Sequence, residues 1–147
     1  MTATATATAT AANTAATAAA AARVIAWFEI PALDFHRAVR FYEAALDAPM
    51  HREVFGGVPM AVFSHGDEAT GGAIVCNPRA MRPSTGGDGV TVYLSAEPTL
   101  QTTLDRIEPA GGKLDGSIVE LPNDIGYIAF FIDTEGNRIG LHSRQLR

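Results

Sequence analysis

The chain has 147 residues, 47% of them hydrophobic, and a formal net charge of −5. A single cysteine, Cys76, excludes an internal disulfide and any cysteine-rich zinc module. No apolar run approaches the length of a membrane span, and the scattered basic residues offer no footprint for a nucleic acid. The composition predicts a globular, cytoplasmic protein with neither a membrane nor a nucleic acid as a partner.

Residues 1–22 differ from the rest, because they contain 13 Ala and 7 Thr and no charge. They lack the basic and strongly apolar regions of a secretory signal. Their side chains are too small to bury useful area, so we expect a disordered tail. Residues 23–147 then form a single domain, long enough to fold around a core of its own.

The first half of this domain predicts a strand, a helix and three further strands. Val24–Ile30 is rich in strand-forming residues, and Asp34 is a good N-cap for a helix that stops before Pro49. Gly56-Gly57 is a strong signal for a two-residue hairpin turn. The apolar stripe of the helix consists of Phe35, Val39, Tyr42 and Leu46, and the later strands are predicted at 50–55, 58–63 and 73–76.

After a connector at 78–89 that is rich in Pro and Gly, the same order begins again. Thr99 is the predicted N-cap of a second helix, which ends at Gly111-Gly112. The segment Asp133–Asn137, with the sequence DTEGN, predicts a tight hairpin loop. The strands of this half are predicted at 90–95, 117–121, 127–132 and 138–142.

The two halves are related by a constant offset, because the second helix repeats the first 65 positions later. This offset relates Asp34 to Thr99, Phe35 to Leu100, Val39 to Leu104 and Tyr42 to Ile107. One unit buries too little alone, so we expect two to share a core. The prediction is an α+β fold of tandem βαβββ units, at 23–77 and 90–143, with mostly antiparallel sheets. A ferredoxin-like domain would explain the short βαβ pieces but not two repeats that end in hairpins.

Three segments carry a family resemblance: Ile30–Leu46, Leu104–Lys113 and Gly126–His142. They resemble the vicinal oxygen chelate superfamily, which includes glyoxalase I, bleomycin-resistance proteins and extradiol dioxygenases. The last segment is the most specific, and the chain looks most similar to small proteins related to lactoylglutathione lyase. The resemblance implies two cup-shaped sheets that enclose one cavity, lined by the first and fourth strands of each unit.

In the metal-dependent members of this family, four inward positions supply the ligands of one divalent ion. Carried over to this chain, three of these positions fall on Trp27, Val92 and Gly140, and the fourth lies in a strand, Ala73–Cys76, without carboxylate or imidazole. Such ions need imidazole, carboxylate or thiolate donors. We therefore expect no metal and no other cofactor.

Glu29 and His142 are the candidate catalytic residues. Glu29 lies in an otherwise apolar strand, where a carboxylate is costly unless it is paired or solvated. It is either a general base or polar anchor in a cavity, or an exposed residue paired with Arg23 or Arg138. His142 is either its partner in acid–base chemistry or a surface histidine, and the choice depends on how the two sheets pair.

The candidate ligand-binding residues are chosen by strand alternation. If Trp27 and Gly140 both point inward, the Trp27 ring fills the place of the metal, and Gly140 opposite it has no side chain. The alternative is that both residues simply pack in the core. Arg138 shares the face of Gly140, and Val92 is placed inward by the repeat. Tyr93 then faces the other way, unless the strand is shifted by one residue before Pro98.

Two kinds of function follow from these residues. One is a lyase or isomerase related to glyoxalase that acts without the usual metal, with Glu29 as base and His142 or Tyr93 as a hydrogen-bond partner. The other is a non-catalytic protein of the bleomycin-resistance type that binds a drug or metabolite. A third possibility is a regulatory subunit with a vestigial cavity. In each case we expect a homodimer, and in the first two a small-molecule ligand.

Overall fold

The computed structural model describes residues 23–84 and 86–147, and the predicted tail at 1–22 lies outside them. In the first unit, the sheet has the order β1-β4-β3-β2, with β1 parallel to β4 and the other pairs antiparallel. Its elements are β1 (Trp27–Pro31), α2 (Phe35–Leu46), β2 (Met50–Phe55), β3 (Val58–Phe63) and β4 (Gly71–Val75). This unit follows the predicted order and confirms the hairpin.

The second unit repeats this arrangement in a sheet of order β5-β9-β8-β6, with β7 also paired to β8. Its elements are β5 (Tyr93–Ser95), α3 (Leu100–Ala110), β6 (Lys113–Leu114), β7 (Val119–Leu121), β8 (Gly126–Ile132) and β9 (Arg138–Ser143). The α+β fold of two βαβββ units is confirmed. The strand predicted at 117–121 is present in part, as β7. A two-residue strand that was not predicted, β6, precedes it, and both pair with the longer β8.

The predicted helix ends are present in both units. The Asp34 side chain accepts a hydrogen bond from the Arg37 backbone N–H, and the Thr99 side chain accepts one from Thr102. Each bond satisfies a helix donor that has no partner within the helix. Gly111 ends α3 in the left-handed region at φ 110°, where a residue without Cβ is favoured. Among the described residues, no helix is long and apolar enough to cross a bilayer.

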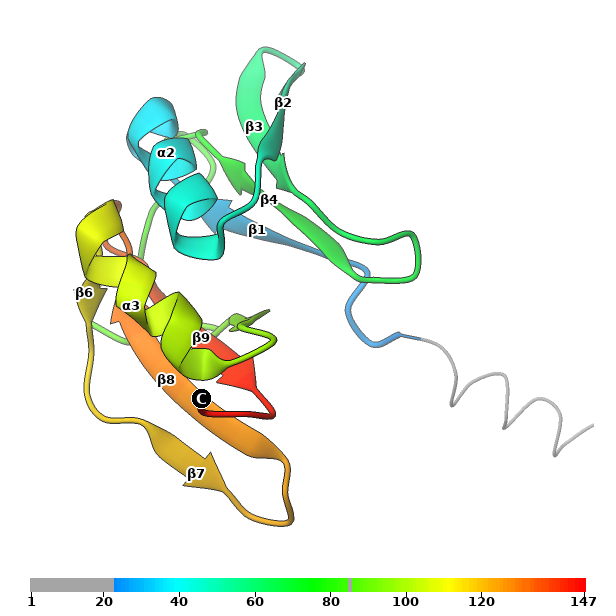
Figure 1. Cartoon of the computed structure of the whole chain (residues 1–147). Helices are drawn as coiled ribbons and strands as arrows, with labels where there is room; N and C mark the ends of the chain where they lie inside the picture. The colour runs from blue at the N-terminus through cyan, green and yellow to red at the C-terminus, as the bar shows by residue number, and fades with distance from the viewer. Residues whose placement is uncertain (1–22, 85) are drawn as a thin grey trace, which may run out of the picture.

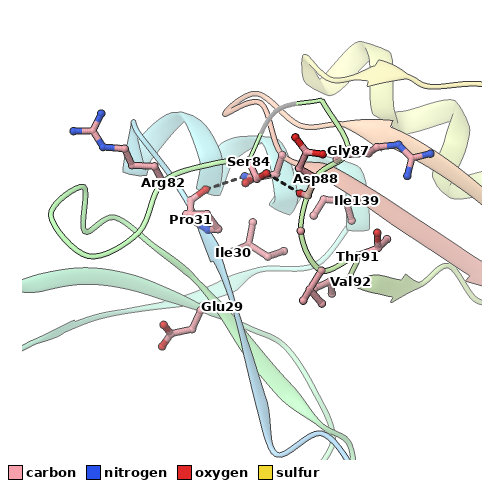
Figure 2. A pocket seen from close by; sticks show the side chains of 14 residues that line it. Glu29, Ile30, Pro31, Arg82, Ser84, Gly87, Asp88, Thr91, Val92 and Ile139 are labelled. Atoms are coloured by element: carbon pink, nitrogen blue, oxygen red, sulfur yellow. Dashed lines mark hydrogen bonds between the residues drawn. The ribbon is translucent and has the colours of Figure 1, made fainter.

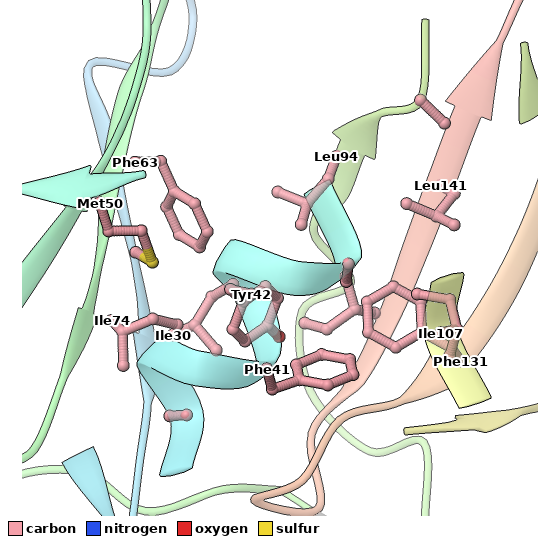
Figure 3. Packing of buried hydrophobic residues seen from close by; sticks show 14 of the residues in the cluster. Ile30, Phe41, Tyr42, Met50, Phe63, Ile74, Leu94, Ile107, Phe131 and Leu141 are labelled. Atoms are coloured by element: carbon pink, nitrogen blue, oxygen red, sulfur yellow. The ribbon is translucent and has the colours of Figure 1, made fainter. Parts of the chain in front are cut away.

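The two helices lie between the two sheets (Figure 1). Figure 3 shows the sheet of the first unit on one side of α2 and strands of the second unit on the other. Phe41 of α2 packs against Phe131 of β8 with ring centroids 5.7 Å apart, and Tyr42 packs against Phe63 of its own sheet at 5.4 Å. A single apolar core therefore joins both units.

This arrangement corrects the expectation of one cavity enclosed by two sheets of the same chain. Because the helices cover the inner face of each sheet, the outer faces lie on opposite sides of the molecule. We call them the first open face, on the sheet of β1, and the second open face, on the sheet of β5. Within one chain, Glu29 and His142 line different pockets.

The hairpin between β8 and β9 connects the second unit to the start of α2. The buried Glu135 carboxylate accepts hydrogen bonds from the backbone N–H groups of Leu33 (2.8 Å) and Asp34 (2.6 Å) and from Arg37 Nε (2.7 Å). Burial raises the pKa of Glu135, but the Arg37 and backbone hydrogen bonds outweigh it and hold the pKa below its ordinary value. The DTEGN loop is therefore a tie between the units as well as a turn.

A second buried carboxylate, Asp133, completes this tie. It accepts a hydrogen bond from the Tyr42 hydroxyl at 2.7 Å and others from Asn137, whose side chain also donates to the Pro31 carbonyl at 2.8 Å. Burial raises the pKa of Asp133, and the bonds from Tyr42 and Asn137 oppose it. Burial, together with the charge of Asp133, holds the pKa of Tyr42 well above its usual value. The aspartate and asparagine of the motif are therefore structural.

Candidate functional site

The first open face carries an aromatic ring over a glycine. Trp27 and Glu29 alternate with Phe28 and Ile30, which pack into the core, so both point outward. Trp27 pairs with Gly71 across the parallel strands β1 and β4. A Cβ on Gly71 would lie 2.5 Å from His65 Nε2 and 2.7 Å from Trp27 Cζ3, so the imidazole and the indole together fill the space where a side chain would stand.

The second open face repeats this pair with Tyr93 and Gly140. The two residues are partners across β5 and β9, and a Cβ on Gly140 would lie within 3 Å of three atoms of the Tyr93 ring. Such contacts mean that the ring covers the Gly140 backbone with one face. The ring is only partly covered, since Tyr93 is 49% exposed.

Val92 was predicted on this face, and that prediction is wrong. Val92 packs against the core and Leu94 is buried, whereas Tyr93 shares the face of Gly140. The connection from Tyr93 to its helix cap, Thr99, is one residue shorter than the one from Trp27 to Asp34. The 65-residue offset, which holds for the helices, is therefore off by one in the strand, and a one-residue shift exchanges the two faces.

If the metal positions of the related family are carried over by register, they fall on Trp27, Gly71, Tyr93 and Gly140, so that Gly71 takes the place of the position expected within 73–76. Trp27 pairs with Gly71, and Tyr93 pairs with Gly140. Each pair joins the parallel first and fourth strands of its unit. Neither a glycine nor an indole donates an electron pair to a divalent cation, and one phenol does not make a site. No cluster of three or more His, Cys, Asp or Glu lies anywhere in 23–84 or 86–147. The residues of this chain do not fit the family's metal.

An open pocket of about 480 Å³ lies on the second open face. This volume is in the range of small-molecule sites. The pocket is lined by three aliphatic side chains and by three that carry a polar group, and its residues are Tyr93, Leu94, Ser95, Leu121, Ile128 and His142. The pocket can therefore bury an apolar ligand while offering it a few hydrogen bonds.

His142 is held in one orientation in this pocket. Its Nε2 lies 2.8 Å from the Ile125 carbonyl oxygen. Because a carbonyl only accepts, Nε2 carries the proton, and a neutral imidazole then presents Nδ1 as an acceptor. His142 can accept a hydrogen bond from a ligand or take up a proton.

Arg138 supports the aromatic rings of the second open face. Its guanidinium lies 3.8 Å from the centroid of the Phe130 ring, which packs edge-on against Tyr93 at 5.6 Å. Its Nε donates to Asp115 at 2.7 Å. Arg138 therefore positions aromatic rings, and its charge is already paired.

Glu29 lies at the side of the molecule where β1 approaches the segment that leads into β5 (Figure 2). A small pocket of about 130 Å³ opens there, with Glu29, Val92 and Arg138 among its lining residues. The Glu29 side chain points away from that of Ile30, outward. Neither suggested partner pairs with it, because Arg23 pairs with Glu68 and Arg138 with Asp115.

The predicted site residues thus fall into two groups. Trp27 and Glu29 lie on the first open face, and Tyr93, Gly140 and His142 on the second. Of the predicted residues, Val92 and Arg138 line the small pocket together with Glu29. Sequence reasoning missed Gly71, Phe130 and the apolar wall of the pocket. The repeat contained a signal for Gly71, because Gly140 requires a counterpart in the fourth strand of the first unit.

Comparisons with known proteins agree with this fold. A family model described as the Glyoxalase/Bleomycin resistance protein/Dioxygenase superfamily matches residues 24–141. The chain is 27% identical over 124 residues to a glyoxylase-like domain-containing protein of Didymella fabae, across 82% of this chain and 93% of that protein.

Among solved structures, glyoxalase I from Zea mays is similar with a TM-score of 0.64 and 22% identity, over 81% of this chain and 45% of that one. A glyoxalase/bleomycin resistance protein from a Streptomyces species is similar with a TM-score of 0.58 and 21% identity, over 81% of this chain and 99% of that one. At these identities the structures show the fold alone. The family model covers most of the chain, which therefore belongs to the Glyoxalase/Bleomycin resistance protein/Dioxygenase superfamily.

Proposed function

We propose that this protein binds a small organic molecule without a metal, in the manner of the non-catalytic, drug-binding members of its superfamily. The observation that carries the proposal is the substitution of two ring-over-glycine pairs for the four ligand positions. One of these pairs adjoins an apolar pocket of about 480 Å³. Aromatic faces and apolar walls bind organic ligands by burial of their surface, and they need no ion to do so.

The polar groups of the second open face would orient such a ligand. His142 offers an acceptor at Nδ1, and the hydroxyl groups of Ser95 and Tyr93 both donate and accept. A few directed hydrogen bonds within an apolar surface are typical of specific small-molecule sites. A cytoplasmic location remains a prediction from the sequence alone.

Thermal melting in the presence of a panel of metabolites and drugs tests this function. A ligand that binds the folded state raises the apparent stability by RT ln(1 + [L]/Kd), whether or not it is turned over. We expect at least one compound to raise Tm, the shift to persist in EDTA, and the Tyr93→Ala variant to lose it. Val54→Ala, at an exposed position on the β2–β3 hairpin, is the control. A panel without any shift, or a shift that EDTA abolishes, would contradict the proposal.

A metal-independent lyase or isomerase is the second candidate, and the Glu29 carboxylate is the observation that favours it. It stands on an apolar strand without an ion pair among the described residues, which is suitable for a general base. Turnover of hemithioacetal substrates by the wild type and its loss in Glu29→Gln would favour the enzyme. Unchanged ligand binding without turnover would favour the binding protein.

A further inference from the structure

A cleft of about 200 Å³ separates the two units at the end of α2. The other end of this helix is held by the DTEGN loop, through the hydrogen bonds that Glu135 accepts from Leu33 and Asp34. The cleft is lined by the last turn of α2 and the start of β2, and on the side of the second unit by α3 and the segment after β5. Because both helices line it, the cleft belongs to the layer between the two sheets. Ser95 is the one lining residue that it shares with the pocket of the second open face.

One wall of the cleft is apolar. It includes Leu46, the last residue of α2, together with Met50 and Phe63, which are partners across β2 and β3 (Figure 3). Met50 and Phe63 are 7% and 9% exposed, so they extend the core to the surface of the cleft. Such a wall can bury an aliphatic side chain of a ligand. The volume lies below the range of about 300–1,000 Å³ that is typical of sites for drug-sized molecules, so the cleft suits a smaller metabolite.

The other wall carries two opposite charges that are not paired with each other. Among the described residues, Arg106 of α3 forms its ion pair with Asp47, over a long distance of 3.5 Å and on the surface. Such a pair is worth little and leaves most of the five guanidinium donors free. Glu97, after β5, accepts a hydrogen bond at Oε1 from the Arg144 backbone N–H at 2.9 Å. This bond holds the carboxylate in place, and no described residue donates to Oε2.

A buried hydroxyl group completes the polar wall. Thr103 lies one turn before Arg106 on the same face of α3 and is only 5% exposed. Its hydroxyl makes no hydrogen bond to another described residue. Among these residues no side-chain oxygen is both fully enclosed and unpaired, so the Thr103 hydroxyl reaches the open space of the cleft. Because buried polar groups normally have a partner, this hydroxyl indicates that a polar molecule fits beside it.

We propose that this cleft binds a free aliphatic amino acid of about the size of leucine. The fork of Arg106 holds the carboxylate of the ligand, Glu97 accepts hydrogen bonds from its ammonium group, and its side chain packs on the apolar wall. A zwitterion supplies both charges at once, whereas a simple acid or a simple amine leaves one charge of the cleft without a partner. This site is additional to the pocket of the second open face and does not rest on the proposed function.

Isothermal titration of the full chain with three related probes tests the ligand class. We expect L-leucine to bind saturably with a Kd below about 1 mM. The probe 4-methylpentanoate lacks the ammonium group, and 3-methylbutylamine lacks the carboxylate. Each should bind at least about tenfold more weakly than L-leucine, because each loses a hydrogen bond between charged groups. The proposal is overturned if L-leucine does not bind, or if either analogue binds as tightly.

Two variants test which residue recognises which charge. Glu97→Gln, which keeps an acceptor for Arg144, should remove the preference for L-leucine over 4-methylpentanoate. Arg106→Met, which keeps the aliphatic stem, should remove the preference over 3-methylbutylamine. Each should bind L-leucine at least about tenfold more weakly than the wild type. Variants that keep both preferences would overturn the assignment.

Matched controls separate this site from general effects on the protein. Glu108→Gln, on the exposed side of α3, and Arg79→Met, in the connector, make the same changes outside the cleft and should bind L-leucine as the wild type does. An unchanged Tm shows that each variant is folded. Tyr93→Ala should also keep L-leucine binding, because Tyr93 does not line the cleft. Loss of L-leucine binding in Tyr93→Ala would place the amino acid in the other pocket and overturn the proposal, while the proposed function would stand.

Discussion

Replacement of Glu135 by alanine should destabilise the protein more than its place in a hairpin loop suggests. The carboxylate accepts bonds from two backbone N–H groups, those of Leu33 and Asp34, and from Arg37. Alanine would leave these donors without a partner at the junction of the two units. The hydrogen bonds that would be lost lie at the start of α2, about a hundred residues away from Glu135 in the sequence.

The expected loss of stability depends on how exposed each hydrogen-bond donor is. Hydrogen bonds to a charged group are worth about 1.5–3 kcal/mol when solvent cannot replace them. The two backbone donors are only partly buried, so we take the lower end for each, and we count the half-exposed Arg37 as a surface ion pair worth nearly nothing. The sum is about 3 kcal/mol, or about 10 °C in Tm for a domain of this size.

Urea unfolding of the full chain, followed by circular dichroism, gives the free energy of unfolding directly. Glu68→Ala is the matched control, because Glu68 is a fully exposed glutamate 3.7 Å from Arg23, and its loss should cost less than about 0.5 kcal/mol. A Glu135→Ala loss below about 1 kcal/mol would refute the reasoning. It would mean that water replaces the carboxylate and that the hairpin does not tie the units together.

The same residue predicts a pH dependence with a definite sign. The folded protein holds the pKa of Glu135 below the ordinary 4.5, so its ionised form contributes stability above that pH. The contribution disappears as the pH falls through the folded value. The difference in stability between wild type and Glu135→Gln should therefore be full at neutral pH and shrink in acid. A difference that grew in acid would contradict this sign.

Three further predictions concern the core and the site. Tyr42→Phe leaves Asp133 without its hydroxyl donor and should cost about 1–3 kcal/mol in urea unfolding, and because the pKa of Tyr42 is raised, its phenol should not ionise before the protein unfolds. Gly140→Ala should displace the Tyr93 ring and weaken ligand binding at least about tenfold, whereas Gly66→Ala, which meets nothing within 4 Å, should not. EDTA should leave Tm unchanged, and a loss of several degrees would revive a metal site.

Local chemistry made much of the fold predictable. Asp34 and Thr99 are caps because of their own side chains, and Gly56-Gly57 turns a hairpin because glycine tolerates positive φ. Such signals are contained in a few adjacent residues. The family resemblance of the closing hairpin was readable for the same reason.

The misplaced residues depend on information that no short segment contains. Val92 and Tyr93 exchange faces because one connection is a residue shorter, and periodicity in a three-residue strand cannot reveal that. Glu135 reads as a turn residue, and nothing near it in the sequence indicates that it holds the start of α2. The separation of Glu29 from His142 follows from the packing of helices between sheets, which is a property of the assembled core.

The ring-over-glycine pairs restrict how a metal site could be introduced into this chain. A carboxylate cannot enter at position 140 while Tyr93 keeps its place, because even the first carbon of the side chain would overlap the ring. At position 71 the first carbon of a side chain would overlap both His65 and Trp27. Trp27 and Tyr93 would have to be replaced before a ligand side chain could fit at these positions, and a chain with only some of the changes would lack a complete set of metal ligands. A metal site at these four positions would therefore require coordinated substitutions, because no ligand side chain fits at 71 or 140 while the neighbouring side chains keep their places.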